Sequence, residues 1–221
     1  RMNQADALAP SLGAGNWAKG NCPTSRLVLI GRDTRHSGPD LLSGLASGLV
    51  SEGLEVRSLG ILPTPALALA VTLEKACLGI MITASHNPAS DNGFKLFDHL
   101  GHKLSPEDES VIESVLPEKV PDSLSAPADD PDSLAAYLGH LATALPEGSL
   151  KDWTIALDTS HGATAHVSRI ALERLGAVVT QIGDASGNQL INDGVGSESP
   201  KRLASLVRET NARLGIAHDG D

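Results

Sequence analysis

The segment CLGIMITASHNPASDNGFKLF, residues 77–97, joins a continuous apolar run directly to a polar loop. An apolar run bounded by turn residues, here residues 77–82, is typical of an interior strand in an α/β sheet. Asn87-Pro88 ends the run, because proline cannot donate to a strand ladder and the residue before proline avoids the helical region. We therefore expect a buried strand that opens into a tight loop.

The loop then returns the chain to the sheet. Residues 91–93, Asp-Asn-Gly, predict a turn, and residues 94–97 alternate in the manner of a second strand. Ser85, His86 and Lys95 are thus gathered near the end of one strand. Open α/β sheets place their ligand sites at strand ends, so we interpret Ser85 as a candidate phosphate-carrying nucleophile.

Strand and helix patterns alternate on both sides of this segment, which indicates an α/β fold with a parallel or mixed sheet. No whole-unit repeat is visible in the sequence. The composition of residues 117–133, rich in Pro, Ser, Asp and Ala, predicts a domain boundary, with a first domain over 1–133 and a second over 134–221. The expected strands are 27–30, 55–59, 77–82, 94–97, 153–157, 178–182 and 214–217, and the expected helices include 5–18, 134–145, 167–175 and 200–210.

The composition narrows the class of protein. Hydrophobic residues make up 41% of the 221 residues and aromatic residues only 2%, so the core must be built from aliphatic side chains. The net charge of −10 argues against a nucleic-acid-binding face, although a few local cations can still recognise an anionic substrate. No apolar run is long enough to cross a membrane.

The two cysteines, Cys22 and Cys77, are too few for a disulfide framework. Cys77 lies in the expected core strand and is interpreted as a small buried hydrophobic residue. The start of the chain lacks the apolar core of a signal peptide. We therefore expect a reducing, cytoplasmic setting.

Ser85 needs activation before it can act as a nucleophile. The Gly-x-Ser-x-Gly pattern of serine hydrolases is absent, because Thr83 and Asn87 stand where its glycines would be, so acyl transfer is disfavoured. Phosphoryl transfer requires mainly positioning, a metal ion and cations around the phosphoryl oxygens. The alternative is a serine that only completes a turn.

Asp219 and Asp221 are the candidate metal ligands. In an extended segment alternate residues point to one side, so Asp-Gly-Asp can direct two carboxylates at one hard cation such as Mg²⁺. Two aspartates do not complete its six-oxygen shell, but a phosphate on Ser85 could add a ligand. The alternative is a solvated acidic turn.

Four side chains are candidate cations for a phosphate: Arg32, Arg35, His86 and Lys95. Each also has an ordinary structural interpretation, as a surface arginine, a turn histidine or an edge lysine.

The remaining histidines offer weaker candidates. His99 and His102 lie three residues apart without a third ligand, so a zinc site there is disfavoured. Asp158 and His161 flank a glycine turn, and a structural role is favoured for both.

Taken together, these blocks resemble the α-D-phosphohexomutases. The loop that contains Ser85, residues 83–88, is called the serine loop below. Together with Asn92-Gly93-Phe94-Lys95 it is similar to the phosphoserine loop of that family. The matching blocks, in order, are 31–38, 63–65, 83–88 with 92–95, 101–104 and 214–221.

The resemblance implies two consecutive mixed-sheet α/β/α domains, the second ending within the metal-binding loop. It implies that Ser85 carries the phosphoryl group and that Asp219 and Asp221, with a further aspartate two residues past Asp221 and the Ser85 phosphate, hold Mg²⁺. His86 and Lys95 would assist proton movement or charge neutralisation, and Arg35 would support the serine loop. The partners would be a hexose phosphate and a hexose bisphosphate.

The chain also departs from the family pattern. The Gly-Ile-Arg-Gly block that precedes the first helix is missing unless Arg1 is its remnant, and the family's sugar-selecting and C-terminal phosphate loops are missing too. By itself the chain is expected to be an inactive fragment. Residues 187–192 with 196–200 resemble the phosphoglucosamine mutases, with phosphomannomutase/phosphoglucomutase and a non-catalytic phosphosugar-binding relative as the alternatives.

Overall fold

A computed structural model describes residues 2–115 and 126–221. The first sheet contains β1 (Leu27–Arg32), β2 (Glu55–Ile61), β3 (Leu78–Ile82) and β4 (Phe94–Phe97) in the order β2-β1-β3-β4. β1 pairs in parallel with both β2 and β3, whereas β4 runs antiparallel to β3. The strand over residues 77–82 is therefore interior, as predicted, and the expected mixed sheet is present.

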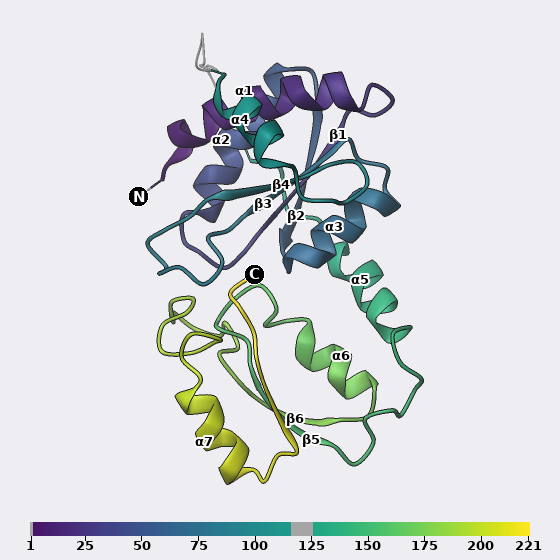
Figure 1. Ribbon diagram of the computed structural model, residues 1–221, viewed down its shortest axis with the longest axis vertical. Helices are drawn as coiled ribbons and strands as arrows, with labels where there is room; N and C mark the ends of the chain where they lie inside the picture. Colours follow the sequence, from purple (N-terminus) through teal and green to yellow (C-terminus); the bar gives the residue numbers. More distant parts are fainter. Residues whose placement is uncertain (1, 116–125) are drawn as a thin grey trace.

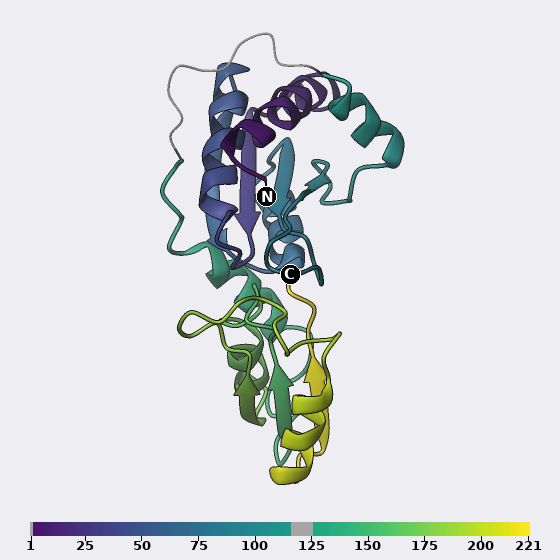
Figure 2. The same cartoon turned by 90° about the vertical axis from the view of Figure 1, so that its left-hand side faces the viewer.

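Helices cover both faces of this sheet (Figures 1 and 2). They are α1 (Gln4–Asn21), α2 (Gly38–Ser51), α3 (Thr64–Leu73) and α4 (Pro106–Glu113). Side chains that alternate along the strands fill the two layers: Val28 and Ile30 pack with α1, α2 and α4, while Leu29 packs with α3. The result is an α/β/α sandwich with an aliphatic core, in keeping with the low aromatic content.

A second α/β unit follows. Its sheet contains β5 (Thr154–Asp158), β6 (Val178–Ile182) and β7 (Leu214–Ala217) in the order β6-β5-β7, with all three strands parallel. α6 (Ser168–Arg174) and α7 (Lys201–Glu209) lie on either side of it (Figure 1). The order β6-β5-β7 repeats the order β2-β1-β3 of the first sheet.

α5 (Ser133–Ala142) lies between the two units and contacts α3 and α6 (Figure 1). Tyr137 and Leu134 of α5 pack against the α3 side of the first unit's core. Much of the expected boundary, residues 117–133, lies outside the described residues. The division of the chain between residues 133 and 134 stays a prediction.

The carboxyl ends of the parallel strands in both sheets face the junction between the units, where the C-terminus also lies (Figures 1 and 2). Loops that follow β1, β3, β5 and β7 therefore meet there, as the strand-end rule for open sheets predicts. None of the described helices is both long and apolar enough to cross a membrane. Cys77 is buried, and burial raises the pKa of its thiol to about 11.

In the first unit, α1 packs closely against α2. A methyl group on Gly44 of α2 would overlap the carbonyl of Gln4 and lie 2.9 Å from Ala7 Cβ. Glycine is therefore required at residue 44, since a Cβ atom would separate the two helices.

We expect Gly44→Ala to destabilise the protein by about 1–3 kcal/mol, because the added methyl overpacks a helix contact. Gly20→Ala is the matched control, because Gly20 also lies in a helix and a methyl group added there would meet no atom within 4 Å. The control should be neutral or stabilising by up to about 1 kcal/mol. Urea unfolding measures both changes, and equal stabilities would contradict the prediction.

Candidate active site

Ser85 lies three residues past β3, at the junction between the two units. Its backbone is left-handed, with φ 55°, a conformation that non-glycine residues rarely adopt. Its hydroxyl bonds to Asp219 Oδ2 and lies 3.0 Å from Asp221 Oδ1. The structure thus brings together the serine and the two acids, although 134 and 136 residues separate them in sequence.

The acids come from the loop after β7, where alternate residues face Ser85 as the extended Asp-Gly-Asp pattern predicted. A methyl group on Gly220 between them would lie 2.8 Å from the carbonyl oxygen of Ser85, so glycine allows the two loops to approach. The carbonyl of Gly220 accepts a hydrogen bond of 2.9 Å from the amide of Ala163. Residues 219–221, called the acid loop below, are therefore held by a hydrogen bond within the second unit and at the same time lie against Ser85 of the first unit.

Asp221 is almost enclosed, with 5% of its side chain exposed. Lys95 Nζ lies 2.5 Å from its Oδ2, and Thr64 Oγ1 donates to the same oxygen at 2.6 Å. Burial alone would raise the pKa of the Asp221 carboxyl, but the hydrogen bonds from Lys95 and Thr64 and the charge of Lys95 outweigh burial and lower it. Asp221 is therefore a carboxylate at neutral pH.

Arg35 is buried beneath the serine loop, with 2% of the residue exposed. Nη1 donates to the carbonyls of Pro88 at 2.5 Å and Asp91 at 2.9 Å. Nη2 donates to those of Ser85 at 2.8 Å and Asn87 at 3.0 Å. One guanidinium thus satisfies four carbonyl groups of a loop that has little secondary structure of its own.

Asp33 holds Arg35 from the other side. Its Oδ2 accepts from Arg35 Nε at 2.9 Å and from Thr83 Oγ1 at 2.7 Å. Burial raises the pKa of the Asp33 carboxyl, and the hydrogen bonds from Thr83 and Arg35 oppose that rise. Asp33, Arg35 and Thr83 form a buried network that connects the end of β1 to the serine loop.

The other predicted cations lie elsewhere. Arg32 bonds to Asp129 at 2.7 Å and makes no hydrogen bond to Ser85, Asp219 or Asp221 among the described residues. His86 is exposed and lines a cavity of about 470 Å³ between the serine loop and residues 190–193. Of the four predicted cations, Lys95 is therefore the one that forms an ion pair with an aspartate at the Ser85 hydroxyl.

Asp158 and the backbone of His161 make structural contacts, whereas Nδ1 of the His161 side chain is buried without a hydrogen-bond partner among the described residues. Asp158 is fully buried and accepts from the amides of Ser160 and Gly196. The carbonyl of His161 accepts from Thr34 Oγ1 at 2.5 Å, across the junction.

Ser85, Asp219 and Asp221 supply oxygen donors, which suit a hard cation such as Mg²⁺. The described residues contain no group of three or more His, Cys, Asp or Glu side chains placed to hold a metal ion, at His99 and His102 or elsewhere. The donor set therefore fits Mg²⁺ only with further oxygens, as a phosphate on Ser85 would provide.

Comparison with known proteins identifies the family of the chain. The family model for phosphoglucomutase/phosphomannomutase, alpha/beta/alpha domain I, matches residues 1–120. The chain belongs to the α-D-phosphohexomutase family. The match covers the N-terminal region of that family.

Relatives of this phosphohexomutase chain include phosphoglucosamine mutases from Streptococcus pyogenes strains, 43% identical over 201 residues. The alignment covers 88% of this chain but 44% of each relative, so the chain spans less than half the length of these curated relatives. A putative phosphomannomutase from Thermus thermophilus is 28% identical, with a TM-score of 0.82 over 99% of this chain and 51% of that one.

A Burkholderia thailandensis protein of the phosphoglucomutase/phosphomannomutase family supports the fold alone. It is 21% identical, with a TM-score of 0.77 over 96% of this chain and 48% of the other.

Two site residues of this phosphohexomutase chain have no role that the sequence alone assigns. Thr64 stands out only as part of the block 63–65, and Asn192 only as part of the block 187–192. Asn192 Nδ2 donates to the carbonyls of Ser85 at 2.8 Å and Asn87 at 3.0 Å. Both blocks carry the family resemblance, which is the one sequence signal that points to them.

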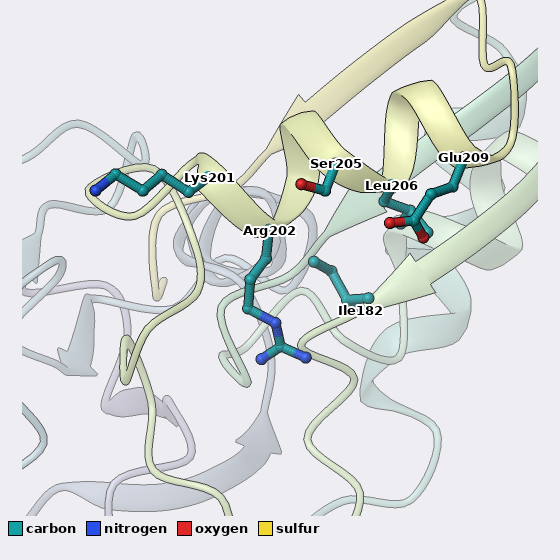
Figure 3. A pocket seen from close by; sticks show the side chains of 6 residues that line it. All are labelled: Ile182, Lys201, Arg202, Ser205, Leu206 and Glu209. Atoms are coloured by element: carbon teal, nitrogen blue, oxygen red, sulfur yellow. The ribbon is translucent and has the colours of Figure 1, made fainter.

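A cavity of about 370 Å³ lies beside α7 and the end of β6 (Figure 3). Lys201 and Arg202 at its rim extend in different directions (Figure 3). None of its six lining residues is buried, so it lacks the convergent, fixed polar groups that mark the junction. The lining residues are Ile182, Lys201, Arg202, Ser205, Leu206 and Glu209.

We expect Arg35→Lys to destabilise the protein by about 2–4 kcal/mol, because an ammonium group cannot reach Asp33 and four carbonyls together. Arg57→Lys is the control, since the Arg57 side chain is 39% exposed and pairs with Glu74 and Asp130 at the surface. It should change stability by less than about 0.5 kcal/mol. Urea unfolding tests both, and a tolerated Arg35→Lys would show that the loop does not depend on the guanidinium fork.

Proposed function

We propose that this chain is the donor-carrying half of a phosphohexomutase in which Ser85 carries the phosphoryl group, with glucosamine phosphate as the favoured substrate. The observation that supports the proposal is the contact of Ser85 Oγ with Asp219 and Asp221, which join it from the other unit. A turn serine has no need of two carboxylates at its hydroxyl, one of which is also paired with Lys95.

In the proposed reaction the phosphoserine gives its phosphoryl group to a free hydroxyl of the hexose monophosphate. The bond between phosphorus and Ser85 Oγ breaks, a bond to the sugar oxygen forms, and the hydroxyl proton passes to a base. The resulting hexose bisphosphate then reorients in the site. Its other phosphoryl group is transferred to Ser85 by the reverse step. The net reaction moves a phosphoryl group between the 6- and 1-positions.

Ser85, Asp219 and Asp221 would hold Mg²⁺ through their oxygens. When bound, the cation would neutralise charge on the transferring phosphoryl group. Lys95 contributes a fixed positive charge beside the same oxygens, at 2.5 Å from Asp221. The positive charges around the transferred group would thus come from both units.

His86 is proposed as the residue that exchanges the proton with the sugar hydroxyl. It follows Ser85 directly and lines the cavity of about 470 Å³ that opens beside the serine loop. Arg35 does not touch the reacting group and is proposed to keep Ser85 in place by holding the loop carbonyls.

The preference for glucosamine phosphate rests on the relatives at 43% identity, which are named phosphoglucosamine mutases, and on the block 187–192. Phosphomannomutase/phosphoglucomutase is the alternative activity. A non-catalytic phosphosugar-binding protein is less well supported, because both the serine and the acids are retained. The acidic charge of −10 and the buried cysteines favour a cytoplasmic enzyme that does not bind nucleic acid.

Ser85→Ala should remove bound phosphate and reduce mutase turnover to background in the complete polypeptide in which this chain occurs, because the phosphoryl acceptor is lost. Ser114→Ala is the control, since the Ser114 hydroxyl bonds only to the carbonyl of Val111 among the described residues and does not line the cavity beside His86. Intact mass after incubation with a hexose bisphosphate and a coupled turnover assay measure the two effects. A phosphorylated, active Ser85→Ala protein would overturn the assignment.

Asp221→Asn should weaken Mg²⁺ binding to the phosphorylated protein by about 100-fold or more, because an anionic ligand becomes neutral. Asp193→Asn changes the same charge at an exposed position and should leave the affinity unaltered. Titration calorimetry with Mg²⁺ compares the two. Equal affinities would place the cation elsewhere.

A further inference from the structure

We propose that Asn192 is a positioning residue that fixes the backbone of the serine loop from the second unit. This inference rests on the proposed function, because it concerns how Ser85 is aimed for phosphoryl transfer. Asn192 follows β6 in the loop that leads to α7, and it meets Ser85 only because the two units face each other.

The two carbonyls that Asn192 contacts are also held by Arg35. The carbonyl oxygens of Ser85 and Asn87 each accept one hydrogen bond from Arg35 Nη2 and one from Asn192 Nδ2. Both lone pairs of each oxygen are therefore used, by one donor from the first unit and one from the second. These contacts also fix the orientation of the Asn192 side-chain amide. If the amide were flipped, Oδ1 would face the two carbonyl oxygens and would have no hydrogen to donate to them.

The need for such a clamp follows from the backbone of Ser85. A left-handed φ of 55° is unfavourable for serine, and strained backbone persists only where surrounding contacts over-determine it. The backbone angle sets the direction of the Cα–Cβ bond and so the direction of Oγ toward Asp219 and Asp221. Hydrogen bonds to the carbonyls of Ser85 and Asn87 therefore help to set the direction in which Ser85 Oγ points.

Asn192 is itself well anchored. Its amide donates to the carbonyl of Ser160 at 2.9 Å, and its own φ of 63° lies in the left-handed region that asparagine tolerates. A methyl group on Gly220 would lie 3.1 Å from Asn192 Oδ1. The same side chain therefore borders both the serine loop and the acid loop, and it couples their positions.

The test substitutes Asn192 in the complete polypeptide. Asn192→Gly keeps the left-handed backbone and removes both donors, and Asn192→Asp keeps the shape but places carboxylate oxygens against two carbonyls. Asn211→Gly is the matched control, because Asn211 also has a left-handed backbone, with φ 49°, and lies just after α7. All variants are first compared by urea unfolding so that folded proteins are assayed.

We expect kcat to fall about 10- to 100-fold in Asn192→Gly and at least as far in Asn192→Asp, as for a misplaced reacting group. KM should change less than about twofold, since a positioning role acts on the reacting geometry, and Asn211→Gly should match the wild type. Hydrogen exchange of residues 83–88 should accelerate only in the two Asn192 variants. This readout also applies if a variant is too unstable for kinetics at the assay temperature.

The outcomes separate the two proposals. A wild-type protein that neither becomes phosphorylated on Ser85 nor turns over a hexose phosphate would overturn the proposed function. A wild-type protein that turns over, with unchanged kcat and unchanged exchange in Asn192→Gly, would overturn the role of Asn192 alone. A rise in KM with kcat unchanged would likewise overturn it, because Asn192 would then bind substrate instead of aiming Ser85.

Discussion

The serine loop depends on one buried guanidinium. Residues 83–93 make few backbone hydrogen bonds to the sheet, and their carbonyls would be costly to bury without donors. Arg35 supplies those donors from a position that is 2% exposed, and Asp33 compensates its charge. This ion pair and the carbonyls that it holds fix the backbone around Ser85 from the side of the first unit.

The secondary structure could be predicted from the sequence, because each element is clearly bounded. The run 77–82 is continuous, apolar and followed by Asn87-Pro88, and it forms the interior strand β3. The segments 153–157, 178–182 and 214–217 form the second sheet in the same way. These elements depend on apolar runs and on the turn residues next to them, and both can be seen in a single sequence.

The site was less accessible from the sequence. Arg32 and Arg35 are three residues apart in one segment, where no periodicity tells which side chain turns inward, yet only Arg35 lies under Ser85. The approach of Ser85 to Asp219 joins residues 134 positions apart, and only the need of Mg²⁺ for more oxygens and the family resemblance point to it in the sequence. The contact of Asn192 depends on its left-handed backbone and on how two units face each other, neither of which its residue type reveals.

The repeated strand order has a consequence for how the junction is composed. Ser85 stands three residues past the end of β3 at Ile82, and Gly220 stands three residues past the end of β7 at Ala217. Asp33 and Asp158 likewise stand at the carboxyl ends of the central strands, and each accepts the amide two residues on. One architectural position thus carries a serine in the first unit and an acid pair in the second, and the contact between them forms only where the two units meet.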